Sequence, residues 1–135
     1  MGNNGLKEIE GALEFSISFD SDGIQLGGAW NYIFQLPPDI PVNKFWSVIV
    51  YDKKTGLIIQ TDQKWPSVFS NCKRLSVNND DSIDIYFGPS APDGKEGNWI
   101  KTIPGDDWKM IIRLYGHTEC SGKRTWKPGE IQKMK

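Results

Sequence analysis

Paired carboxylates are the residues of this 135-residue sequence whose spacing most directly suggests chemistry, because glycoside hydrolysis uses two carboxyl groups that flank one bond. The adjacent sets are Asp20 with Asp22, Asp80 with Asp81, and Asp106 with Asp107. Each set stands in a stretch rich in Gly, Ser, Asn or Pro, where an Asp side chain ordinarily bonds to the backbone of a turn. We therefore interpret these carboxylates as turn residues rather than as catalytic pairs.

Asp84 differs from those carboxylates because it stands among apolar neighbours in a strand-like stretch, and Arg113 stands in a similar stretch. Buried charges persist only when they are paired and hydrogen-bonded. We therefore predict that Arg113 pairs with a carboxylate, either Asp84 or Asp52. Two alternatives stay open: a buried fork that fixes strand register, or a polar anchor at the floor of a ligand cleft. In the second case Tyr115 would complete the site of an enzyme that acts on carbohydrate or another polar substrate.

Asn98 and Trp99 form the aromatic candidate site, at the end of the longest expected loop. An exposed indole ring offers an apolar face to the C–H groups of a sugar, so a glycan is a candidate ligand. Large aromatic residues are more often core than exposed. The structural alternative is that Asn98 ties down the loop backbone while Trp99 closes one end of the domain.

Metal and cofactor chemistry have little support in the sequence. The chain has one histidine, His117, and two cysteines, Cys72 and Cys120, which are too few for a ligand cluster or a disulfide framework. No glycine-rich loop opens a helix, so no phosphate cradle is expected. The formal net charge of -1 gives no electrostatic footprint for nucleic acid. We expect no metal, no cofactor, no nucleic-acid partner and two reduced thiols.

Targeting signals are also missing from the sequence as written. No apolar run reaches the roughly 18 residues that a membrane-spanning helix needs, so no membrane insertion is expected. The first five residues lack the basic and apolar regions of a signal peptide. The chain is therefore expected either to be cytoplasmic as written or to be a trimmed piece of a longer protein, and the sequence does not assign its compartment.

The elements that must position these residues are short strands. Residues 45–51 form a nearly continuous apolar run, typical of a strand covered on both faces. Residues 52–56 form a turn, and a second strand at 57–59 completes the expected hairpin. Residues 13–20 alternate between apolar and polar side chains, typical of a half-buried strand. Residues 61–71 are expected to be a loop. Further strands are expected at 24–26, 29–36, 72–77, 83–87, 99–103, 108–115 and within 126–134.

This pattern predicts an all-β fold with eight to nine short strands and no helices, either a β-sandwich or a β-barrel. We expect a flexible N-terminal segment at residues 1–12 and a single domain at residues 13–135. Six aromatic-rich motifs occur in order along that domain: "FDSDGIQLGGAWNY" at 19–32, "FWSVIVYDKKTG" at 45–56, "NNDDSIDIYFG" at 78–88, "KEGNWI" at 95–100, "RLYG" at 113–116 and "WKP" at 126–128.

These motifs resemble a family known as the domain of unknown function 1214. The resemblance implies an antiparallel β-sandwich of jelly-roll type. Family members commonly follow a companion domain, numbered 1254, in bacterial proteins that are often secreted or envelope-associated, and the sequence as written has no room for that companion. The sequence also departs from the family in two other places. Asp80-Asp81-Ser82 stands where members tend to have "DGS", and "NWIKTIP" stands where they tend to have "NWLP.P". The resemblance implies no activity.

We predict a non-catalytic module for binding or assembly, whose partner is another protein or companion domain, a glycan, or a second copy of itself. A third hypothesis is that the domain is a structural assembly unit. The alternative is the enzyme with the Asp/Arg/Tyr cleft. The predicted binding residues are Asp52, Asp84, Asn98, Trp99, Arg113 and Tyr115.

Overall fold

The computed structural model describes residues 5–9, 12–38, 40, 42–63, 66–71, 73–117 and 129–134. Its strands are β1 (Gly5–Ile9), β2 (Ala12–Ile17), β3 (Tyr32–Leu36), β4 (Val42–Asp52), β5 (Ser67–Phe69), β6 (Ile83–Gly88), β7 (Trp99–Lys101), β8 (Trp108–His117) and β9 (Ile131–Lys133). One 3₁₀ turn, η1 (Glu96–Asn98), precedes β7 in this part of the chain. None of its helical segments is long and apolar enough to cross a membrane.

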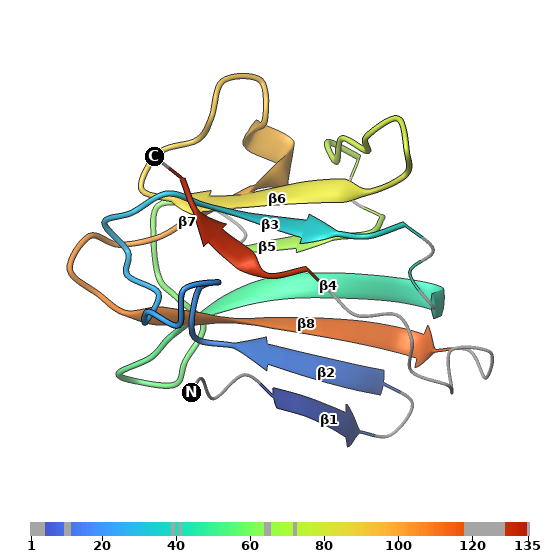
Figure 1. Ribbon diagram of the computed structural model, residues 1–135, viewed down its shortest axis with the longest axis horizontal. Coiled ribbons are helices and arrows are strands. Elements are labelled where there is room, and N and C mark those ends of the chain that lie inside the picture. Colours follow the sequence, from blue (N-terminus) through green and yellow to red (C-terminus); the bar gives the residue numbers. More distant parts are fainter. Residues whose placement is uncertain are drawn as a thin grey trace.

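The strands form two sheets that lie face to face, which confirms the predicted β-sandwich (Figure 1). The five-stranded sheet has the order β1-β2-β8-β4-β5, and the four-stranded sheet has the order β7-β6-β3-β9. Among the described strands, every pair is antiparallel except β6 with β7. These two run parallel because the segment after β6, which includes η1, carries the chain back alongside β6 before β7 begins. Both sheets are therefore antiparallel apart from this one pair, and the jelly-roll topology stays a prediction.

The core lies between the sheets and centres on β4 and β8, so the prediction of a central strand at residues 45–51 is confirmed. Alternate residues of β4, from Trp46 to Val50, point inward and are almost fully buried. Trp108 of β8 packs edge-on against Tyr32, with ring centres 5.6 Å apart, and lies 4.8 Å from the ring centre of Phe87. These rings join β8 to both β3 and β6, because large aromatic side chains reach across the layer between the sheets.

Several local predictions were wrong at the edges of the sheets. Gly5–Ile9, expected to be flexible, pairs with β2 as β1. Its few apolar residues gave no alternation, and an edge strand can be held by backbone pairing alone. Ser67–Phe69, expected to be loop, is β5, whereas residues 73–77 form no strand. Residues 57–59 contribute only an isolated bridge, Tyr51 to Ile58, and not a full hairpin strand. The extent of a single domain from residue 13 to 135 stays a prediction.

Candidate functional site

The outward side of the five-stranded sheet, which we call the outer β8 face, is the first candidate surface. Strand register aligns its side chains in rows across β2, β8, β4 and β5, alternating with inward core residues. A sheet face exposed to water usually presents polar side chains. This one presents Phe45, Ile49, Tyr51, Phe69, Ile111 and Tyr115 around a central ion pair of Arg113 and Glu14, with Ser16, Ser47, Ser67 and Lys109 among them.

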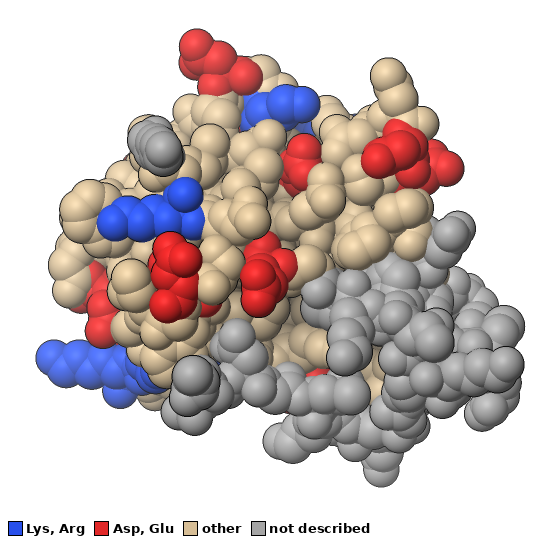
Figure 2. All heavy atoms as spheres, in the orientation of Figure 1, with Lys and Arg blue, Asp and Glu red and all other residues tan. Residues whose placement is uncertain are grey.

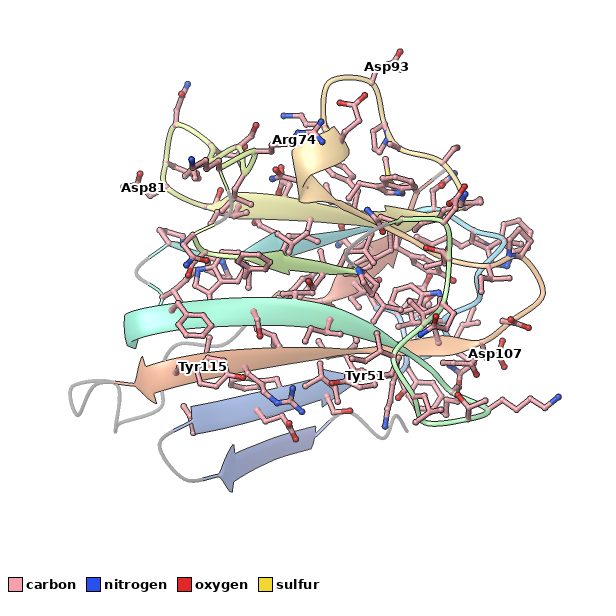
Figure 3. The ribbon with its side chains drawn as sticks, turned by 180° about the vertical axis from the view of Figure 1, so that it is seen from behind. Tyr51, Arg74, Asp81, Asp93, Asp107 and Tyr115 are labelled. Atoms are coloured by element: carbon pink, nitrogen blue, oxygen red, sulfur yellow. The ribbon has the colours of Figure 1, made fainter. Side chains whose placement is uncertain are left out.

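Aliphatic and aromatic side chains make this face more apolar than the solvent-exposed face of a sheet usually is. Ile111 is only 9% exposed, yet it is not part of the core cluster between the sheets. Phe45 is 39% exposed and stacks on Tyr115, with ring centres 4.5 Å apart and planes 24° from parallel. Tyr51 and Tyr115 lie apart along the strands of this sheet (Figure 3). The face thus offers apolar contacts at Ile111 and at the stacked pair of Phe45 and Tyr115.

Arg113 lies at the middle of the outer β8 face and pairs with Glu14, which faces it directly on β2. Its Nε donates a hydrogen bond to Glu14 Oε2 at 2.7 Å, and its Nη1 donates to Tyr51 Oη at 3.4 Å. The Arg113 and Glu14 side chains are 28% and 11% exposed. Burial lowers the pKa of Arg113, but the hydrogen bonds to Tyr51 and Glu14 outweigh it and raise the pKa above its ordinary value. The guanidinium therefore stays positively charged, and the adjacent Glu14 carboxylate balances its charge.

The predicted partners of Arg113 were wrong, although its pairing with a carboxylate is confirmed. Asp84 belongs to β6 in the other sheet. Asp52 ends β4 and stabilises the following turn, where its Oδ1 accepts hydrogen bonds from the backbone N–H groups of Lys54 at 2.8 Å and Thr55 at 3.2 Å. Glu14 was missed because its partnership depends on which strands become neighbours, and local alternation carries no information on that.

The outward side of the four-stranded sheet is the second candidate surface. Asp84 lies here, where its Oδ1 accepts a hydrogen bond from Gln35 Nε2 at 3.3 Å and its Oδ2 accepts one from Asn78 Nδ2 at 3.2 Å. Burial and the nearby Asp84 charge raise the pKa of Tyr86, which keeps its phenol neutral. A hollow of about 200 Å³ opens beside Asp84, between β3, β6 and the approach to β9.

Asn98 is 2% exposed and anchors backbone, as its structural alternative proposed. Its Nδ2 donates to the carbonyl oxygens of Ser76 and Asp84 at 2.9 and 2.8 Å, and its Oδ1 accepts from the Ser76 N–H at 2.8 Å. Trp99 is half-buried, and its Nε1 donates to the Gly88 carbonyl oxygen at 3.1 Å. A ligand-binding role for either residue stays a prediction.

The structure brings Asn98 next to the backbone of Asp84 but separates the predicted site residues into two surfaces. Arg113 and Tyr115 lie on the outer β8 face, whereas Asp84 and Trp99 lie on the outward side of the other sheet. The two surfaces face away from each other across the core. The expected cleft of Asp84, Arg113 and Tyr115 is therefore not formed.

Charge and metal ligands add no further site among the described residues. No group of three or more His, Cys, Asp or Glu side chains there could hold a metal ion. Basic and acidic residues are interspersed on the face that Figure 2 shows, without a continuous basic patch over its described part. Lys101 Nζ pairs with Asp62 Oδ1 at 2.6 Å on the surface. Cys72, Cys120, Trp65 and Trp126 fall outside the described residues.

Comparisons with known proteins agree with this fold. The family model described as "Protein of unknown function (DUF1214)" matches residues 11–119. No curated protein matches the chain. The crystal structure of the VPA0106 protein from Vibrio parahaemolyticus is similar, with a TM-score of 0.77 at 24% identity, over 92% of this chain and 31% of that one. An uncharacterised protein from Burkholderia cenocepacia has a TM-score of 0.61 at 17% identity, over 94% and 30%. The chain thus spans about a third of these solved proteins.

Proposed function

Because the chain belongs to the DUF1214 family, which is described without an activity, we propose a function from its geometry: a non-catalytic assembly module that binds a second copy of itself through the outer β8 face. The observation that carries this proposal is the apolar character of an outward sheet face. Ile111, Ile49 and the stacked pair of Phe45 and Tyr115 lie where solvated side chains would ordinarily stand. Aromatic side chains and Arg are also the residues enriched where proteins meet.

The charges at the centre of the face support a second copy as the occupant. A two-fold interface must be complementary to itself, because the same patch contributes both halves. One cation and one anion, Arg113 and Glu14, lie side by side at the centre. A two-fold axis near them would set each guanidinium of one copy against the carboxylate of the other. Since the two charges are already paired, covering them leaves no buried charge without a partner.

The enzyme alternative has no corresponding support. It requires Asp84, Arg113 and Tyr115 to converge on one pocket, and these residues lie on different sheets with the core between them.

Sedimentation velocity on the whole chain tests the proposal. A series from about 1 μM to about 1 mM covers binding free energies from about -8 to -4 kcal/mol. We expect a reversible shift from monomer to dimer within this range. Phe45→Glu should abolish the shift, because it places an unpaired carboxylate in the apolar contact and is exposed enough to leave folding intact.

The matched control is Leu57→Glu, since Leu57 is 68% exposed and lies in the turn after β4. This variant should dimerise like the parent chain. A chain that stays monomeric at every concentration would contradict the proposal, as would a dimer that Phe45→Glu leaves unchanged. Either result would favour a different polypeptide as the partner of this face. One candidate is a chain that corresponds to the part of the longer solved relatives that this chain does not match.

A further inference from the structure

The hollow on the outward side of the four-stranded sheet is a polar site that dimerisation through the other sheet does not use. It is lined by Ile33 and Gln35 of β3, Asp84 of β6, and Gly129, Glu130 and Gln132 around the start of β9. One rim holds the hydrogen-bonded pair of Gln35 and Asp84. The other rim holds Glu130 and Gln132, both exposed. Each rim thus pairs a carboxylate with a carboxamide, above an aliphatic floor.

A row of side chains runs across the sheet through this hollow. In register, Trp99 of β7 lies opposite Tyr86 of β6, Tyr86 lies opposite Ile33 of β3, and Ile33 lies opposite Gln132 of β9. Neighbouring strands are about 4.8 Å apart, so the row spans about 14 Å from β7 to β9. Trp99 and Tyr86 are half-buried, so part of each ring remains accessible. The row therefore combines aromatic surface at one end with polar rims at the other.

Gly129 brings the chain before β9 close to β3 beside the hollow. Its N–H donates a hydrogen bond to the Gln35 carbonyl oxygen at 3.0 Å. A Cβ atom at position 129 would lie 2.6 Å from that oxygen, closer than real side chains come. The close approach of the chain to β3 beside the hollow therefore requires glycine.

We propose that this row binds a neutral oligosaccharide, with its sugar rings laid across the strands from Trp99 to Gln132. Sugar hydroxyls donate to the carboxylates of Asp84 and Glu130, while the carboxamides of Gln35 and Gln132 both donate and accept. The apolar C–H faces of the rings pack on Ile33 and on the accessible parts of the Tyr86 and Trp99 rings. Two carboxylates at the rims repel uronic acids, so the ligand is neutral. This site is independent of the proposed dimer face.

Isothermal titration calorimetry with hexasaccharides tests the proposal on the whole chain. The probes are the β-1,4-linked hexamers of glucose, mannose and N-acetylglucosamine, with the hexamer of galacturonic acid as the acidic comparison. We expect saturable binding of at least one neutral hexamer and none of the acidic one. The double variant Glu130→Gln with Gln132→Ala should weaken binding about tenfold, because it removes contacts from one rim.

The matched control is Glu96→Gln with Gln60→Ala, which makes the same chemical changes at exposed positions that do not line the hollow. This variant should bind like the parent chain. The proposal is overturned if none of the neutral hexamers binds, or if the Glu130/Gln132 variant binds as tightly as the control. Since Glu130 and Gln132 are exposed, equal thermal unfolding of the variants will show that a loss of binding is not a loss of folding.

Discussion

Replacement of Asn98 by alanine should destabilise the domain strongly, although the residue is polar and lies beside a loop. The side chain is 2% exposed and makes three hydrogen bonds of 2.8 to 2.9 Å, which join η1 and β7 to Ser76 and to β6. Each such bond contributes about 1 kcal/mol net, and the substitution also leaves two carbonyl groups and one N–H without this partner. We therefore expect a loss of about 3 kcal/mol in the free energy of unfolding.

Urea unfolding followed by tryptophan fluorescence measures this loss. Asn79→Ala is the matched control, because Asn79 is exposed in a turn and should change stability by less than about 0.5 kcal/mol. Asn98→Asp keeps an acceptor for the Ser76 N–H but sets carboxylate oxygens against two carbonyl oxygens, so it should destabilise at least as much as alanine. A cost below about 1 kcal/mol for Asn98→Ala would refute the assignment of Asn98 as a buried anchor.

Three further substitutions test individual interactions. Asp81 has a backbone φ of 69°, in the left-handed region that glycine adopts without strain. Asp81→Gly should therefore raise the free energy of unfolding by about 0.5 kcal/mol, measured by chemical denaturation. A decrease in the free energy of unfolding would contradict backbone strain at this position. Glu14→Ala should lower the free energy of unfolding by about 1 to 2 kcal/mol, because it leaves Arg113 without its carboxylate. The double variant Glu14→Ala with Arg113→Ala should lose less stability than the two single variants together. Additive losses in this double-mutant cycle would count against the ion pair. Hydrogen bonds from Ser82 hold the pKa of Asp80 below its ordinary value, so their contribution to stability is present above about pH 4 and is lost as the pH falls through the folded-state pKa. Ser82→Ala should raise the Asp80 pKa in an NMR titration, and an unchanged value would exclude this cause.

Strands with a regular apolar alternation or a continuous apolar run could be predicted from the sequence. β2, β3, β4, β6 and β8 each place apolar side chains inward at every second position, and each was expected near its observed place. The edge strands β1 and β5 were missed because short edge strands need little apolar surface to pair. The strand expected at residues 72–77 is not formed over its described residues, where only Leu75 packs against the core.

The candidate sites depended on information that local patterns do not hold. Arg113 could be recognised as a charge in need of a carboxylate, because it stands in an apolar strand. Its partner Glu14 lies 99 residues away and becomes adjacent only because β2 pairs with β8. The sequence also suggested Asp84 as the partner of Arg113, because nothing in it assigns β6 and β8 to different sheets. The two outer faces thus follow from topology, and topology is a property of the whole chain.

Hydroxyl-radical footprinting of the chain at low and high concentration tests the proposed assembly most directly, because it reports which side chains a partner copy covers. We expect the oxidation of Phe45 and Tyr115 to fall as the protein concentration rises through the dimerisation range. Trp30, which is 53% exposed and lies outside the outer β8 face, should be oxidised equally throughout. Equal oxidation of Phe45 and Tyr115 in a sample that has dimerised would contradict the assignment of this face as the interface.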